Sequence, residues 1–197
     1  DMNIIEKPEP EDTPFYINNG TINVGNTNGK VILQTFSLES LVRVAEVFQG
    51  KVPMCFLLWK GTGATDLTYD DPLGYASFIN LGVKYKAHFI GPCIAGAPND
   101  YPELDQPWQD YLIHRAKMKN HPYTFDTYDQ MAKYFGQYNF GVADGMFNPP
   151  YLDALFTNHS DMSINYMITH GWRKSPASQT LVDAREVLRK LGYLDNN

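Results

Sequence analysis

The stretch Val31-Ile-Leu-Gln-Thr-Phe36, followed by Ser37 and by Leu38-Glu-Ser-Leu-Val-Arg-Val-Ala-Glu-Val-Phe48, decides the fold class. The first run is rich in β-branched and apolar residues, which favours a strand. In the second run apolar residues recur every three or four positions, which predicts a helix. Ser37 suits the N-cap of that helix and Gly50 its end. A strand followed directly by a helix is the repeating unit of α/β proteins.

The same unit recurs outward from this stretch. Further strands are predicted over Met2–Ile5, Pro53–Trp59, Ala87–Pro92, Asn120–Phe125 and Tyr151–Thr157. Further helices are predicted over Leu73–Leu81, Trp108–Lys117, Tyr128–Phe135 and Gln179–Leu191. Residues 17–30, rich in Asn and Gly, are expected to form an irregular loop. The alternation implies a parallel sheet with right-handed crossovers.

Two architectures have this order of elements, a (β/α) barrel and an open doubly wound sheet. No strand is followed by a G-x-G-x-x-G fingerprint, which disfavours the open dinucleotide-binding sheet. In a barrel the site lies at the carboxyl ends of the strands. Polar or aromatic residues at such predicted ends are Glu6, Gln34, Trp59, Tyr123 and Asn158.

Charge and composition exclude some partners. The formal net charge of −6 argues against nucleic acid, because binding its phosphates requires a Lys- and Arg-rich surface. No apolar run approaches the roughly 20 residues that span a bilayer, so no transmembrane segment is expected. Cys55 and Cys93, the two cysteines, each lie in or beside an apolar run and are expected to be buried thiols.

Several fragments together resemble the glycerophosphodiester phosphodiesterase family. Val31–Phe36 resembles its apolar-Gln-Ser-Phe strand, and Ile90-Gly-Pro92 matches a shorter piece. His121-Pro-Tyr-Thr-Phe125 resembles the Trp/Tyr-Thr-Val strand of the periplasmic branch. Asp153-Ala-Leu-Phe-Thr-Asn158 with Asp161 is similar to the family's exit from the last strand. The fragments stand in family order and cover residues 31–165.

This resemblance implies a TIM-type (β/α) barrel. With Met2–Glu6 as the third strand, the chain holds about strands 3–8 of the eight, as a single domain over residues 1–197. The barrel is then incomplete, and its partner is expected to be an N-terminal segment of the same barrel or another copy of the chain. The likeness to the periplasmic branch implies a periplasmic or secreted location.

The resemblance also implies site residues. The family's third strand ends in Glu-x-Lys, where the Glu is a metal ligand and the Lys contacts phosphate. Here Glu6 and Lys7 are adjacent, so on a regular strand they point to opposite faces. Glu6 is carried over as a ligand of Ca²⁺ or Mg²⁺ and Lys7 as the phosphate contact. Gln34, Trp59 and Tyr123 are expected to line the pocket for the glycerol or alcohol end of the substrate.

The expected activity is metal-dependent hydrolysis of a glycerophosphodiester to an alcohol and glycerol 3-phosphate. The family's His-Arg-Gly motif, its Glu-x-Asp ligands and its second catalytic His have no counterpart in this sequence. The catalytic histidines are therefore expected from a segment upstream, and this chain alone is expected to be inactive. The alternatives are a non-catalytic barrel that binds a phosphorylated or glycan ligand, and a sphingomyelinase D-like lyase.

Plainer interpretations apply to other conspicuous residues. Phe36 and Phe156 are expected in the core, and His121 as a hydrogen-bonded structural histidine. Asn158 is expected to brace a loop. The acidic residues Asp66, Asp70 and Asp71 are expected on a solvated loop rather than at a cation.

Overall fold

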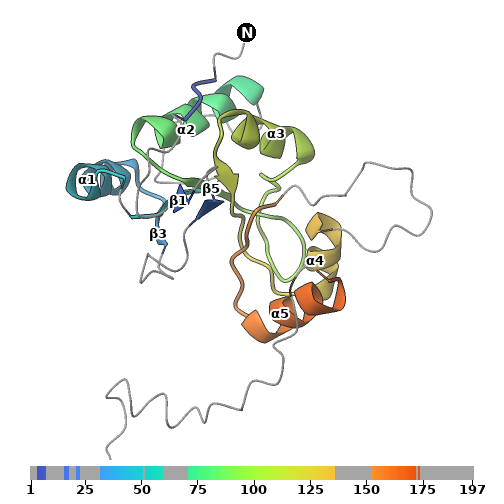
Figure 1. Cartoon of the computed structure of the whole chain (residues 1–197). Coiled ribbons are helices and arrows are strands. Elements are labelled where there is room, and N and C mark those ends of the chain that lie inside the picture. Colours follow the sequence, from blue (N-terminus) through green and yellow to red (C-terminus); the bar gives the residue numbers. More distant parts are fainter. Residues whose placement is uncertain are drawn as a thin grey trace, which may run out of the picture. The chain divides into compact units, whose positions relative to one another are not determined.

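The structure is a computed structural model of the whole chain (Figure 1). It describes residues 4–7, 16–17, 21–22, 32–50, 52–59, 71–135, 152–171 and 173. The chain forms two compact units that divide between Ser163 and Ile164, and each is taken separately below. The single domain expected over residues 1–197 stays a prediction.

The larger unit is built on a four-stranded parallel sheet. Its strands are β3 (Leu33–Thr35), β4 (Met54–Leu58), β5 (Phe89–Pro92) and β6 (Lys119–Asn120). They lie side by side in chain order, β3-β4-β5-β6. The α/β class and the parallel sheet predicted from the alternation are confirmed.

Each connection between neighbouring strands contains a helix. These helices are α1 (Leu38–Phe48), α2 (Pro72–Lys84) and α3 (Pro107–Arg115). The Ser37 hydroxyl accepts a hydrogen bond from Ser40 N at 3.3 Å, so the predicted N-cap of α1 is confirmed. Asp71, expected on a solvated loop, is exposed, and it also caps α2 by accepting from Leu73 N at 3.3 Å. Asp66 and Asp70 lie outside the described residues.

Two further helices follow the sheet, α4 (Tyr128–Phe135) and α5 (Ser160–Thr169). The bounds of α4 are those predicted from the sequence. The helix α5 crosses the division between the units at Ser163. The helix predicted over Gln179–Leu191 lies outside the described residues.

The helices α1, α2 and α3 pack on the same face of the sheet, and Figure 1 shows all three labelled around the strands. On β4 the alternate side chains Met54, Phe56 and Leu58 point into this core. Phe56 stacks on Phe78 of α2 with ring centroids 4.2 Å apart. The sheet is therefore wound on one side, because all three crossovers cover one face.

The second face of the sheet is the one opposite α1–α3. On β4 the intervening side chains Cys55 and Leu57 point to it and pack with Phe89 of β5. Three partly buried residues pack against this cluster, namely Ile32, Tyr123 and Phe156. Both faces of β4 are thus buried, which explains why its sequence is apolar at every position.

Two expectations for the first 30 residues are corrected. Residues 4–7, the described part of the predicted first strand and its exit, form no strand. They lie against the helices instead, because Ile5 N donates to the Asn80 side chain of α2 at 2.8 Å and Lys7 N donates to Ala116 O at 2.8 Å. Within the stretch expected as a loop, β1 (Tyr16–Ile17) pairs antiparallel with β2 (Thr21–Ile22).

The strand predicted over Tyr151–Thr157 is also corrected, because the described residues 152–157 form no regular strand. The segment nevertheless runs beside the chain that follows β6. Asp153 N donates to Asn120 O at 3.0 Å, Phe156 N to Pro122 O at 2.9 Å and Phe125 N to Phe156 O at 2.8 Å. These hydrogen bonds are irregularly spaced, so the segment lies beside this chain without forming a ladder.

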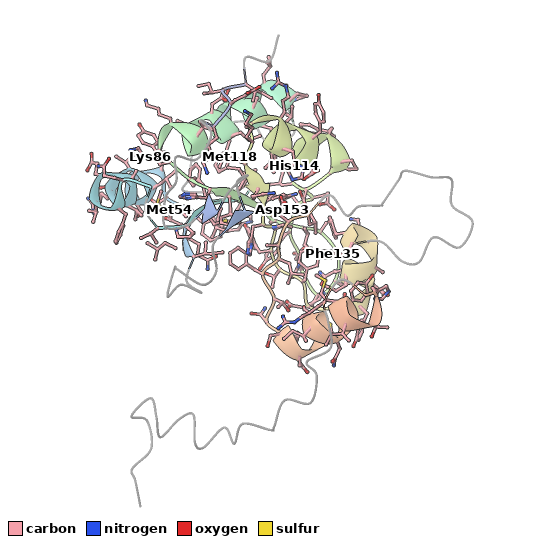
Figure 2. All side chains as sticks on the ribbon, viewed as in Figure 1. Met54, Lys86, His114, Met118, Phe135 and Asp153 are labelled. Carbon is pink, nitrogen blue, oxygen red and sulfur yellow. The ribbon has the colours of Figure 1, made fainter. Side chains whose placement is uncertain are left out.

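The Asp153 carboxylate anchors this segment (Figure 2). It accepts hydrogen bonds from His114 Nε2 at 2.7 Å, Lys119 Nζ at 3.0 Å and Asn120 N at 2.8 Å. Hydrogen bonds from His114 to Asp110 and Asp153 raise the pKa of His114 to about 9. The imidazole is therefore charged at neutral pH. Asp153, the first residue of the resembling exit motif, thus has a structural role in this fold.

Two other expectations are confirmed, for the cysteines and for Asn158. Cys55 and Cys93 are buried free thiols. The Asn158 side chain braces its loop by donating to Asp126 at 3.1 Å. Among the described residues, no helix is long and apolar enough to cross a membrane.

Candidate functional site: an aromatic rim at the carboxyl edge of the sheet

Aromatic side chains gather where the strands end. Phe36 directly follows β3 and Trp59 directly follows β4. Tyr123 lies three residues after β6 and forms a parallel bridge with Cys93, just beyond β5. The carboxyl ends of parallel strands share one edge of the sheet, so residues distant in sequence meet there.

These rings contact one another. Phe36 packs edge-on against Trp59, with centroids 6.4 Å apart, and against Tyr123, with centroids 5.6 Å apart. A fourth ring, Tyr101, lies 6.1 Å from Tyr123. All three separations fall in the range of attractive aromatic pairs. We call Phe36, Trp59, Tyr101 and Tyr123 the aromatic rim.

Much of the rim is open to solvent. Trp59 is 42% exposed, Phe36 41% and Tyr101 37%, whereas Tyr123 is partly buried. Large exposed aromatic side chains that cluster in this way are typical of binding sites rather than of ordinary surface. The rim is therefore the candidate site of the described chain.

The Tyr123 hydroxyl is already engaged. It donates to Leu58 O at 3.0 Å, at the end of β4. Burial, with Cys93 nearby, raises the pKa of Tyr123 above its ordinary value, so the phenol stays protonated. Tyr123 thus offers a ligand its ring rather than an acid–base group.

Gln34 lies on the second face of the sheet, two residues before Phe36. It pairs in register with Cys55 of β4, and its side chain is exposed. The structure thus places Trp59 and Tyr123 just beyond the carboxyl ends of the strands. Gln34, the third predicted pocket residue, shares a register row with Cys55, Phe89 and Lys119, near the amino ends of β4, β5 and β6. Trp59 and Tyr123 are joined through Phe36.

Glu6 and Lys7 lie elsewhere. Glu6 pairs with Arg115 and with Lys117, whose Nζ is 3.5 Å away; Arg115 ends α3 and Lys117 lies in the connection from α3 to β6. Lys7 N is bonded to Ala116 O in the same connection. That connection leads into the amino end of β6, so Glu6 and Lys7 lie at the edge opposite the aromatic rim.

The surroundings of Glu6 do not fit a divalent cation. Hydrogen bonding to Arg115 and the charges of Arg115 and Lys117 lower the pKa of Glu6, so its carboxylate already has cationic partners. Ca²⁺ takes six to eight oxygen ligands, several of them carboxylates. Across the part of the chain that the structure describes, no three His, Cys, Asp or Glu residues are grouped so as to hold a metal.

Lys7, the expected phosphate contact, also lies away from the aromatic rim. Burial lowers the pKa of its ammonium group to about 8. Its charge is felt by His88, just before β5, whose pKa is lowered to about 3 mainly by burial and secondarily by Lys7. Both residues thus belong to the amino edge of the sheet.

His121 is a buried histidine on the second face. Its ring lies edge-on to Phe89 at 5.5 Å and 4.0 Å from Phe156, and it is 6% exposed. Its Nδ1 has no hydrogen-bond partner among the described residues. His121 is therefore buried, as expected of a structural histidine, but its Nδ1 lacks the expected hydrogen bond. Burial lowers the pKa of His121 to about 4.

Protonation of the buried His121 is expected to make the fold less stable in acid. Its folded pKa lies below the ordinary value of 6.5, so its destabilising effect is absent above pH 6.5 and grows as pH falls toward 4. Between pH 7 and pH 4.5 we expect this residue to cost about 2 kcal/mol of the free energy of unfolding. Urea unfolding of the wild type and of His121→Phe at both pH values measures the effect.

The phenylalanine ring keeps the shape of the imidazole but takes up no proton. His121→Phe should therefore lose less stability on acidification than the wild type, and it should be about as stable at pH 7 because an unpaired buried nitrogen is removed. His159→Phe, at an exposed position, is the control and should keep the wild-type pH dependence. Equal acid sensitivity of His121→Phe and wild type would contradict the assignment.

Sequence reasoning missed two members of the rim. Phe36 was expected in the core, yet it is exposed at the end of a short strand. Tyr101 lies in the Pro- and Gly-rich connection between β5 and α3, and nothing in its local sequence indicates a position beside Tyr123. The available signal was its place after a strand end, where barrel sites are built.

No family model matches the chain, and no curated protein matches its sequence.

Proposed function

We propose that this chain forms the carboxyl-terminal part of a glycerophosphodiester phosphodiesterase-type barrel. Its aromatic rim, with Gln34, would bind the glycerol or alcohol end of the substrate. The observation that carries the proposal is the meeting of Trp59 and Tyr123 through Phe36 at the carboxyl edge of the sheet. Tyr123 comes from His121–Phe125, one of the fragments that carry the family resemblance. Trp59 ends the predicted strand Pro53–Trp59, which lies between two such fragments.

One-sided winding supports the barrel. Strands β3 to β6 follow one another in space as in sequence, and α1, α2 and α3 all cover one face. A doubly wound sheet reverses its strand order and places helices on both faces. A TIM-type barrel has neighbouring strands in chain order and all its helices outside. Its interior would then correspond to the second face, which carries Gln34, Cys55 and Phe89.

The proposed reaction is hydrolysis of a glycerophosphodiester to an alcohol and glycerol 3-phosphate. A divalent cation, Ca²⁺ or Mg²⁺, would neutralise phosphate charge in such a reaction. The described residues contribute binding and orientation. The groups for metal binding and proton transfer would come from outside them, either from another segment of the barrel or from a second copy. The resemblance to the periplasmic branch supports a periplasmic or secreted location.

Binding to the chain itself tests the proposed pocket. We expect glycerophosphocholine to bind. Trp59→Ala should raise its dissociation constant about tenfold, which is a loss of about 1.4 kcal/mol of binding free energy, because an exposed ring of the rim is lost. Isothermal titration calorimetry measures both. Tyr111→Ala removes a ring that is 63% exposed on α3, outside the rim, and should bind as the wild type does. Equal binding by Trp59→Ala and wild type would contradict the pocket.

Activity is tested on the full-length product of the gene. Release of glycerol 3-phosphate should require Ca²⁺ or Mg²⁺ and stop with a chelator. Glu6→Gln separates the two placements of Glu6. Unchanged activity fits the ion pair seen here, and loss of the metal-dependent activity fits a ligand role. A full-length protein that contains a His-Arg-Gly motif and shows no metal-dependent release would overturn the proposed reaction.

A second function is favoured by the surroundings of Glu6. Its pairing with Arg115 and Lys117 suits a barrel that binds a phosphorylated or glycan ligand without catalysis. Such a protein would bind the ligand at the rim and release no product in the same assay.

A further inference from the structure

The connection between β5 and α3 holds Tyr101 in place from both sides. Before it, the Asn99 side chain donates to Thr124 O at 2.7 Å, beside Tyr123. After it, Glu103 accepts from Lys133 Nζ at 2.6 Å and bonds Tyr134, both on α4. Tyr101 is therefore presented to the rim by a fastened loop rather than by a free one.

A second attachment fixes the start of the same loop. The Gln130 side chain of α4 donates to Gly96 O at 2.9 Å, and its oxygen accepts from Asp126 N at 2.7 Å and Thr127 N at 3.0 Å. Gln130 is 3% exposed, so these bonds are shielded from water. A ring held in advance loses little conformational freedom on binding, which favours its use in recognition.

The chemistry of the rim favours one kind of ligand group. Its four residues carry no charge, and the Tyr123 hydroxyl is used by Leu58 O. What the rim offers is therefore aromatic surface, at Phe36, Trp59 and Tyr101 above all. Ring faces attract a methylated cation, which needs no hydrogen-bond acceptor. A primary ammonium group or a polyol needs such partners and gains less from ring faces alone.

We propose that Tyr101 is a specificity-determining residue that selects substrates whose alcohol carries a quaternary ammonium group. The inference rests on the proposed function, because it assigns the alcohol end of the glycerophosphodiester to the rim. Tyr101 supplies the wall that faces Tyr123, and Asn99 and Glu103 position it. Tyr101 reaches the rim from a loop outside the sheet, whereas Trp59 directly follows a strand.

The test compares glycerophosphocholine with glycerophosphoethanolamine, two probes that differ only in the methyl groups on nitrogen. Titration calorimetry on the wild-type chain should give a dissociation constant about tenfold lower for the choline ester. Tyr101→Ala should reduce this preference to about twofold or less, because the wall is lost. Tyr101→Phe keeps the ring and should keep the preference. Tyr111→Ala, a tyrosine of α3 outside the rim, should also keep it.

Circular dichroism and urea unfolding show whether each variant folds, so loss of preference is separated from loss of structure. A folded Tyr101→Ala that keeps the tenfold preference overturns the inference. Equal binding of both esters by the wild type also overturns it, and leaves the proposed function standing. Failure of the proposed function has a separate readout: the full-length protein then releases no glycerol 3-phosphate from either ester, whatever preference calorimetry measures.

Discussion

Replacing Phe56 by alanine is expected to lower the free energy of unfolding by about 4 kcal/mol. Phe56 is 0% exposed at the centre of β4, and its ring stacks on Phe78 of α2 at 4.2 Å. Truncation removes the buried ring and leaves a cavity between the sheet and the helix layer. Chemical denaturation with urea, followed by far-ultraviolet circular dichroism, measures the loss.

The control is the same substitution at the end of α1. Phe48 is 39% exposed, so Phe48→Ala should cost less than about 1 kcal/mol. A similar cost at the two positions would mean that α2 does not pack on β4 as described. The comparison thus tests the one-sided layer on which the proposed barrel depends.

Replacing Gly91 by alanine is expected to cost about 3 kcal/mol. A Cβ at this position would lie 2.7 Å from Leu57 Cδ2, 2.8 Å from Cys55 Sγ and 3.0 Å from His121 O. Two of these atoms belong to the packed second face, and the third is the backbone oxygen of the residue after β6, whose N–H donates to Ile90 O. Relief therefore requires β4 and β6 to move apart, which thermal unfolding of Gly91→Ala would detect as a lower midpoint.

Gly82 supplies the matched control. A Cβ there would meet the tips of two flexible side chains, Ile90 Cδ1 at 3.0 Å and Met118 Cε at 3.4 Å. Alanine also favours a helix over glycine by about 1 kcal/mol, so Gly82→Ala should change stability by less than about 1 kcal/mol in either direction. Tolerance of Gly91→Ala at the same level would contradict the packing of the second face.

Elements with local signals were predicted well from the sequence. The bounds of α1 and α4 agree with the prediction because caps and apolar spacing lie within each segment. For α2 the prediction began one residue late and ended three residues early, since Pro72 begins the helix and Lys84 ends it. The order of parallel strands also followed, because alternation of strands and helices allows few topologies.

Elements that depend on distant partners were predicted poorly. The apolar run before Glu6 looked like a strand, but Asn80 and Ala116 engage its backbone instead. The segment after Asp153 looked like a strand too, and the salt bridges of Asp153 set its position. No local pattern in the sequence reports such long-range contacts.

The residues of the candidate site also differ in how well the sequence predicted their positions. Trp59 and Tyr123 were predicted at one edge of the sheet because strand ends in a parallel sheet converge, and both rings contact Phe36 there. Glu6 was chosen by likeness to a motif whose spacing it lacks, and the structure places it at the other edge. Tyr101 was missed because the long-range bonds of Asn99 to Thr124 and of Glu103 to Lys133 determine where the loop lies.

One-sided winding also has a consequence for how this unit assembles. Strand neighbours in space are neighbours along the chain, and each connection contains a helix. Each added strand and helix therefore closes a short loop onto a surface that already exists, and loop-closure entropy grows only slowly with loop length. Each parallel pair is itself non-local, as in Cys55 with Phe89, so folding is expected to be slower than that of a helical bundle. The sheet can form progressively from β3 to β6, without waiting for pairing between remote ends of the sequence.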